Sequence, residues 1–392
     1  MSQAVVFPTS AIRVQEQASS AVPWYVYSLL VASASALIGE CWDVSWHISI
    51  GRDSFWTAPH MMIQFCAILG AFTCSFLILQ TTFGQDSDSR QASVHVMGFR
   101  GPLGAFVVMW GAAAMLTSAP FDNWWHNAYG LDVKILSPPH VVLGLGIGCV
   151  QLGGLLLTLG CMNRAEGKLR NQLDWIFLCA GGLVLSQVLA FSQEYLGLPL
   201  MHSAIYYRAL CITAPLILIG VAESSGKKWA ATALAAIYIG LRLVIMLTLR
   251  QFPAQPKLGP VYNNVTHFVF PYFPSLIIAP ALCLDLLRRS FRKRSPWFKS
   301  VVLGIGFLVT LVAVQWPFAT FLMSPRSRNW FFATADFPYY WAPTSPSVRH
   351  VFLVWEATGT LFGEGMLIAL IAAIIGSRIG FGWSRWMRSV RR

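Results

Sequence analysis

The stretch APHMMIQFCAILGAFTCSFLILQTT occupies residues 58–82 and contains no Asp, Glu, Lys or Arg. About 20 consecutive apolar residues are enough to cross a bilayer as a helix. In lipid every backbone polar group must be satisfied inside a helix or a closed barrel. Because the apolar run is long and uninterrupted, it favours a helix over a strand. We therefore predict a transmembrane helix here.

Similar runs recur along the whole chain of 392 residues. Hydrophobic residues make up 56% of the sequence and charged residues only 11%, too little charge to solvate the surface of a soluble protein of this size. We predict an all-α, polytopic membrane helix bundle of about ten transmembrane helices in contact with the lipid bilayer. The predicted spans are residues 23–46, 58–82, 103–119, 141–161, 173–193, 206–222, 229–249, 268–287, 301–322 and 351–375.

The net charge of +12 could indicate a nucleic-acid-binding protein, but the positions of the basic residues argue against this. Most of the 28 Lys and Arg residues fall in alternate loops and in the C-terminal tail. Cytoplasmic loops carry an excess of Lys and Arg. We therefore predict a multi-pass protein of the cell inner (plasma) membrane, with both termini cytoplasmic and no nucleic-acid partner.

The ten predicted spans form five helical hairpins, and a histidine stands near the start of each returning helix. These histidines are His60, His140, His202, His267 and His350. Repeated hairpins indicate internal duplication, and only the first two carry the fuller pattern described below.

This difference predicts four parts of the chain. They are a cytoplasmic N-terminal segment (1–22), a four-helix metal-site module (23–172), a six-helix membrane module (173–377) and a basic cytoplasmic tail (378–392).

The first hairpin places Asp43 and His47 four residues apart, on one face of the first predicted helix. They stand at its outer, C-terminal end, where the negative pole of the helix dipole favours a cation. A loop with Gly51 and Pro59 then returns the chain, so that His60 can approach from the second helix. The spacing Asp-x3-His-x12-His predicts a metal site at the non-cytoplasmic face.

The second hairpin repeats this arrangement with Asp122, His126 and His140 in an Asp-x3-His-x13-His spacing. Two imidazoles and one carboxylate suit copper, zinc or non-haem iron and leave coordination positions open. A single hairpin of this kind occurs by chance, whereas two matched hairpins favour metal binding over a structural hydrogen-bond network. Three further residues are candidates for the surroundings of the ligands, namely Glu40 as a partner and Arg52 with Asp53 as a brace for the loop.

The residues from Asp43 to His60 resemble the metal-site segment of the C-type subunit of the particulate methane and ammonia monooxygenases, the copper membrane monooxygenase family. That family has Asp-x3-His-x12-His with an Arg-Asp pair, matched here by Arg52 and Asp53. Its second site is Asn-x3-His-x13-His, and Asp122 stands at the position of that Asn. The resemblance covers about residues 26–161 and is that of a distant relative.

The resemblance implies copper as cofactor, with zinc or iron less expected. It also implies dioxygen-dependent oxidation of a small apolar or ammonia-like substrate, with other membrane subunits or an electron donor as partners. Two alternatives stay open. One is a metal transport or assembly protein that uses residues such as Met61, Met62, Cys66 and Cys74 as soft ligands. The other is a structural subunit of a membrane complex.

Overall fold

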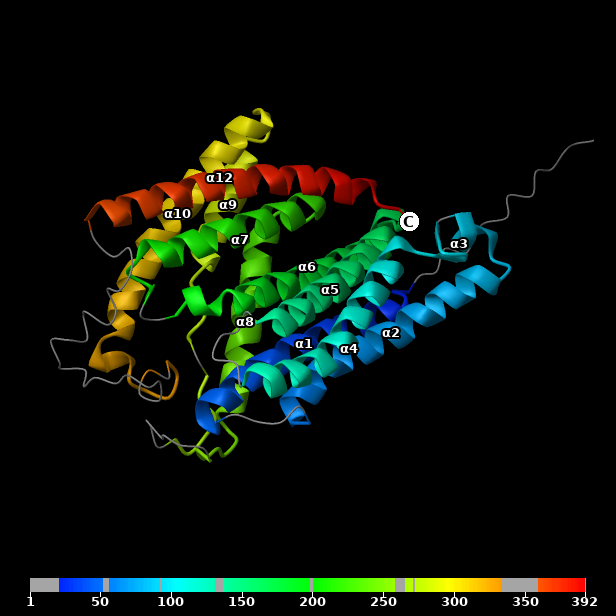
Figure 1. Ribbon diagram of the computed structural model, residues 1–392. Coiled ribbons are helices and arrows are strands. Elements are labelled where there is room, and N and C mark those ends of the chain that lie inside the picture. The colour runs from blue at the N-terminus through cyan, green and yellow to red at the C-terminus, as the bar shows by residue number, and fades with distance from the viewer. Residues whose placement is uncertain are drawn as a thin grey trace, which may run out of the picture.

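The computed structural model describes residues 21–51, 56–91, 93–130, 137–197, 200–257, 265–270, 272–332, 334 and 359–391. Within these ranges the chain is a bundle of long helices (Figure 1). They are α1 (Trp24–Ser49), α2 (Ala58–Phe83), α4 (Leu103–Tyr129), α5 (Pro138–Arg164), α6 (Gly167–Phe191), α7 (Ala204–Ser224), α8 (Ala230–Leu249), α10 (Pro296–Leu322) and α12 (Gly359–Ser389). Among the described residues, these nine helices are long and apolar enough to cross a membrane. The all-α bundle and the multi-pass composition are therefore confirmed.

Five short helices and strands were not predicted as separate elements. Between α2 and α4 lie α3 (Ser87–Gln91) and an antiparallel hairpin of β1 (Val94–Val96) and β2 (Phe99–Gly101), in which Val94 pairs with Gly101. The 3₁₀ helices η1 (Gln193–Tyr195) and η3 (Pro325–Ser327) follow α6 and α10.

The eighth predicted span, residues 268–287, is not a continuous helix. Only its second half is helical, as α9 (Ile278–Ser290). The described residues between 265 and 276 run without regular secondary structure. Pro271 and Pro274 lie in this half of the predicted span, and a proline both lacks the N–H of a helical residue and disfavours the helical conformation of the residue before it. A continuous helix was predicted from the apolar composition of residues 268–287, although the two prolines disfavour a helix in its first half.

Two helices extend beyond the predicted spans. The third span was predicted to end at residue 119, but α4 continues through Pro120 to Tyr129, which places Asp122 and His126 on the helix itself. The tail from residue 378 was separated from the last span, but α12 runs without a break to Ser389. Its end is fixed by Asn163, whose Nδ2 donates to the carbonyls of Met387 (3.0 Å) and Val390 (2.8 Å).

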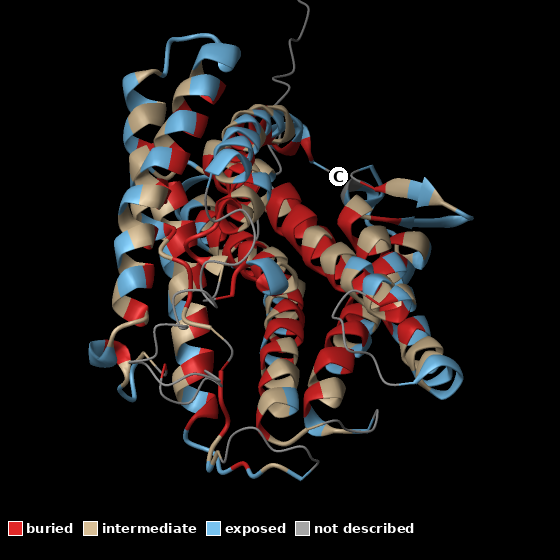
Figure 2. Cartoon of the chain, turned by 60° about the vertical axis from the view of Figure 1, so that its left-hand side comes forward, coloured by how far each residue is buried: buried red, intermediate tan, exposed pale blue. Residues whose placement is uncertain are grey.

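Two larger hydrophobic cores and a smaller third one organise the bundle. Helices α1, α2, α4 and α5 enclose one core, and α5 also contributes Leu155 and Leu159 to a larger core that it shares with α6 to α10 and α12. The third core joins α1, α6 and α8 to Phe268 and Phe270. Figure 1 shows α1, α2, α4 and α5 on one flank, with α7 and α12 crossing the opposite flank. Buried residues follow the facing sides of the helices, while exposed residues lie on the outer sides and at the ends (Figure 2). Because α5 belongs to both larger cores, the division at residue 172 stays a prediction.

Candidate metal centres

The first candidate centre is built where α1 ends and α2 begins. Asp43 and His47 lie in the last turns of α1, and the chain leaves this helix through Gly51, whose φ of 121° lies in a region that favours glycine. Thr57 is the residue before α2, and Pro59 occupies its first turn, where the missing N–H has no intrahelical partner to lose. His60 follows directly and so faces the end of α1.

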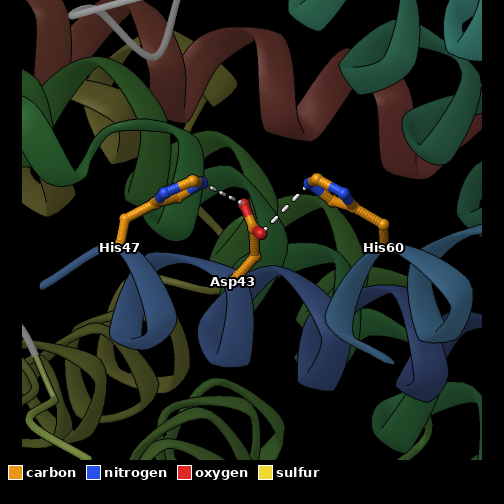
Figure 3. A group of neighbouring side chains, drawn as sticks. All are labelled: Asp43, His47 and His60. Carbon is orange, nitrogen blue, oxygen red and sulfur yellow. Dashed lines mark ion pairs between the residues drawn. The ribbon is translucent and has the colours of Figure 1, made fainter. Parts of the chain in front are cut away.

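The two imidazoles approach the Asp43 carboxylate from two sides (Figure 3). His60 Nε2 lies 3.1 Å from Asp43 Oδ1, and His47 Nε2 lies 3.6 Å from Asp43 Oδ2. Helices α1 and α2 pack closely beside the site, since a Cβ on Gly39 would stand 2.7 Å from the side chain of Ile63. Gly39 therefore lets α1 and α2 come together one turn before the ligands.

The second candidate centre repeats this geometry where α4 ends and α5 begins. His126 Nε2 and His140 Nε2 each lie 3.4 Å from Asp122 Oδ1. Gly130 stands four residues after His126, as Gly51 does after His47, and has a φ of 85°. Closely packed glycines again join the two helices, because a Cβ on Gly111 would lie 2.6 Å from the carbonyl oxygen of Gly146.

Both centres lie at the same end of the bundle. Helices α1 and α4 end there, while α2 and α5 begin there, and each pair packs as an antiparallel hairpin. At the assembled site the dipole of α1 no longer favours a cation by itself, because the positive end of α2 opposes the negative end of α1. The attraction for a cation comes instead from the Asp43 and Asp122 carboxylates.

The orientation of His126 fixes its tautomer. Its Nδ1 lies 3.2 Å from the carbonyl oxygen of Gly130, and a carbonyl only accepts hydrogen bonds, so Nδ1 carries the proton. In the neutral ring, Nε2 then has a lone pair that faces Asp122 Oδ1. Two acceptors facing each other need a positive charge between them, either a metal ion or a proton on the ring. Metal-bound histidines usually donate their second ring N–H in this way.

A metal ion fits both sets of side chains. Asp43 Oδ1 and Asp122 Oδ1 are buried, and imidazole nitrogens lie 3.1–3.4 Å from them. In each set one ligand atom from every residue lies within 4.8 Å of the others. Ligand atoms bound at about 2.0–2.2 Å to a common ion are separated by at most about 4 Å, so a small inward movement would complete either site.

The six predicted ligands are thus brought together as two groups of three, and their metal binding stays a prediction. Glu40 accepts a hydrogen bond from Gln187 Nε2 on α6, and its predicted place among the surroundings of the ligands stays a prediction. Arg52 and Asp53 lie outside the described residues. The sequence analysis placed Gly51 in the returning loop but missed its counterpart Gly130, although a glycine four residues after the helical histidine in both hairpins was a visible signal.

A second support for the first centre comes from a distant part of the chain. Ser45 Oγ donates to the carbonyl of Val269 (2.6 Å), and the N–H of Val269 donates to Ser49 Oγ (2.8 Å). The ring of Trp46 packs on Phe268 at 6.0 Å between centroids. These contacts hold the end of α1 against the non-helical segment before α9. No local pattern in the sequence indicated them.

Comparison of the chain with protein-family models, with curated proteins and with solved structures gave no match.

Proposed function

We propose that the chain is a multi-pass membrane protein that binds two copper ions, one in each hairpin site. One observation carries this proposal: two separate hairpins assemble the same set of one carboxylate and two imidazoles, with the ligand atoms of each set within 4.8 Å. A network of neutral hydrogen-bonding side chains does not account for the second site, because His126 Nδ1 donates to Gly130 and its Nε2 directs a lone pair at Asp122 Oδ1. A bound cation would satisfy both of these acceptors.

The donor set favours copper among the divalent metals. For mixed nitrogen and oxygen ligands, affinity rises along the first transition row toward copper. Asp43, His47 and His60 would hold one ion, and Asp122, His126 and His140 the other. Bound copper would supply one-electron redox chemistry next to positions left open by only three protein ligands. Zinc is the main competitor for such a site.

The placement of the basic residues supports one orientation in the membrane. The ends of the helices opposite the candidate centres carry the clusters around Arg164, Arg288 and Arg388. Because cytoplasmic segments are enriched in Lys and Arg, we place this end in the cytoplasm and the metal centres at the non-cytoplasmic face of the inner membrane. Both chain termini are then cytoplasmic.

Ten crossings follow if the broken eighth span also crosses the membrane. Val269 lies beside Ser49 at the end of α1, whereas Asp285 on α9 receives a hydrogen bond from the N–H of Thr232 at the start of α8 (2.9 Å). The non-helical segment and α9 together therefore traverse the depth of the bundle. Labelling of introduced cysteines from outside tests this topology: we expect residues 325–332 to react and residues 224–226 to be protected, and the reverse pattern would refute it.

The oxidase activity that the sequence resemblance implies needs more than this chain. Hydroxylation of a C–H or N–H bond by dioxygen consumes two electrons and two protons and releases one water molecule. The electrons would come from a partner subunit or a quinol. The alternative of a soft-ligand transport path has less support, because Cys66 and Cys74 are fully buried in the hydrophobic core of the first four helices.

Metal analysis of the purified protein tests the copper proposal. Cells supplied with copper should yield protein with two copper ions per chain and a Cu(II) spectrum with nitrogen ligands, and chelation should remove both. His47→Ala and His126→Ala should each remove one ion, and the double variant both. His95→Ala is the matched control, since His95 is exposed on β1 at the other end of the bundle. Wild-type protein that contains only zinc, or no metal, would refute the proposal.

A further inference from the structure

A non-helical segment lies deep in the bundle where the eighth predicted span is broken. Backbone N–H groups at this depth need partners, and here side chains provide them. The N–H of Ser275 donates to Tyr238 Oη on α8 (3.2 Å), and the N–H of Leu276 donates to Gln315 Oε1 on α10 (2.9 Å). Irregular backbone at membrane depth occurs where it is buried in protein or lines a cavity, and in transporters such broken helices form ligand sites.

A small cavity of about 20 Å³ lies beside this segment. Its walls come from the end of α6 and η1, from the middle of α8, and from residues 272–275 of the broken span. Its polar lining consists of Gln193, Tyr238, Arg242, Tyr272 and Ser275. A water molecule needs about 10–15 Å³ measured in this way, so the cavity has room for one small ion or one to two water molecules.

Arg242 places a positive charge at this cavity. Its side chain is buried, with 6% of its surface exposed, and one guanidinium nitrogen donates to Cys41 Sγ on α1 (2.9 Å). The ring of Phe270 lies 4.5 Å from the guanidinium carbon. In the described part of the chain Arg242 makes no ion pair with a carboxylate. A buried guanidinium without a paired anion is costly, and charges at membrane depth tend to mark functional positions.

Two more hydrogen-bonding side chains line the cavity. Gln193 is 6% exposed, and its side-chain amide makes no hydrogen bond in the described structure. Tyr238 is 3% exposed, and its hydroxyl bonds only to the backbone N–H and the side chain of Ser275 among the described residues. Buried polar groups are nearly always hydrogen-bonded. Donors of three kinds, with a positive charge among them, therefore face one small space whose described lining includes no carboxylate.

Two acidic residues lie near Arg242 without lining the cavity. Glu40 on α1 is the carboxylate that acts on Arg242 electrostatically, but its hydrogen bond is to Gln187. Glu194, beside Tyr272, is exposed, so solvent screens its charge.

We propose that this cavity is a binding site for a small monovalent anion of about the size of chloride, held by Arg242, Gln193 and Tyr238. The site is separate from the two candidate metal centres, and it does not depend on the proposed copper binding. Its position between α6, α8 and the broken span would let one anion tie these parts of the bundle together.

Equilibrium binding of radioactive chloride to the purified full-length chain tests the proposal. The protein is first treated with a chelator to remove metal ions, and gluconate, which is too large for the cavity, replaces chloride in the buffer. We expect one saturable chloride per chain. Removing a hydrogen bond to a charged group costs about a tenfold change in affinity or more. Gln193→Leu and Tyr238→Phe should therefore each weaken chloride binding by about that factor, and Arg242→Met should abolish it.

Two control variants test whether chloride binds at this cavity and at no other place. Tyr207→Phe removes a buried hydroxyl that donates to the carbonyl of Met201 (3.1 Å), away from the cavity, and should leave chloride binding unchanged. His60→Ala should also leave it unchanged. If Arg242→Met does not fold, Gln193→Leu and Tyr238→Phe still test whether chloride binds in the cavity. Absence of saturable binding would mean that the cavity holds only water, and binding that survives all three cavity variants or is lost in His60→Ala would also overturn the proposal.

Discussion

The two candidate metal centres have the same ligands but different supports. At the first, the end of α1 is held by two hydrogen bonds: Ser45 donates to the carbonyl of Val269, and the N–H of Val269 donates to Ser49, more than 200 residues away in sequence. At the second, the described contacts are local: His126 bonds to Gly130, and the rings of Phe121, Trp124, Trp125 and Tyr129 pack against one another around the end of α4. A duplicated motif has thus been placed in two different structural contexts.

The ligands and their support therefore have separate origins in the sequence. The hairpin motif supplies the carboxylate and the imidazoles, whereas the packing of the remaining helices decides how firmly they are held. Groups that orient metal ligands typically change metal affinity by about 10–100-fold. We therefore expect the two centres to bind the same metal with different affinities, and the first centre to bind more tightly.

The largest expected effect is the loss of a ligand. Asp43→Ala should remove the ion of the first centre and leave the second filled, and Asp122→Ala should do the reverse, because no residue is shared between the sets. Each loss should exceed the roughly 10–100-fold change that follows loss of an orienting hydrogen bond. Copper counting on each variant measures this. Loss of both ions in either single variant would show one coupled centre in place of two.

The next largest effect tests the local support of the second centre. Gly130 has φ 85° and ψ 179°, a backbone conformation that is nearly restricted to glycine and costs other residues about 1–3 kcal/mol. Gly130→Ala should displace the carbonyl that orients His126 and weaken copper binding at the second centre by about 10–100-fold. Gly148→Ala, in the middle of α5 with open space around it, is the control and should bind two ions normally.

These local features explain why the candidate centres could be predicted from the sequence. Asp43 and His47 are four residues apart, which fixes one face of a helix whatever the rest of the chain does. His60 and His140 follow a Ser or Thr and a Pro that start a helix. The rules that relate such spacings to geometry act over a few residues. They were therefore sufficient to predict both ligand sets from the sequence.

Such short-range rules could not predict the break in the eighth span or the contacts of α1 with the segment around Val269. Apolar composition alone predicts a helix for residues 268–287, and the decisive signal was the pair of prolines at 271 and 274. Proline is not a sufficient signal, because α4, α7 and α10 continue through Pro120, Pro215 and Pro317. Which proline ends a helix depends on whether neighbouring side chains, such as Tyr238 and Gln315 here, satisfy the freed backbone.

A smaller effect tests the distant support of the first centre. Stepwise chelation should empty the second centre before the first, with about a tenfold difference in affinity. Replacing both Ser45 and Ser49 by Ala should remove the hydrogen bonds to Val269 and bring the two affinities close together. Ser118→Ala, which removes a hydroxyl bonded within α4, is the control. Should the first centre lose its ion before the second in wild-type protein, the role given to these contacts would be wrong.

The smallest effect concerns one hydroxyl that distinguishes the starts of α2 and α5. Thr57 Oγ1 lies 3.2 Å from His60 Nδ1, so it can accept the ring N–H and leave Nε2 free for a metal. Its counterpart, Ser137 Oγ, is buried and has no hydrogen-bond partner. Thr57→Val keeps the shape of the side chain and should weaken copper binding at the first centre by at most about tenfold.

Ser137→Ala is the matched variant at the second centre and should leave its affinity unchanged, because it removes no hydrogen bond. Neither hydroxyl caps its helix, so any change in affinity reports on the imidazole and not on the stability of the helix start. Copper titration of both variants against wild-type protein measures the difference. Equal weakening in the two variants would mean that Ser137 turns toward His140 once the metal is bound, and the hydroxyl would then be a shared feature of the two hairpins.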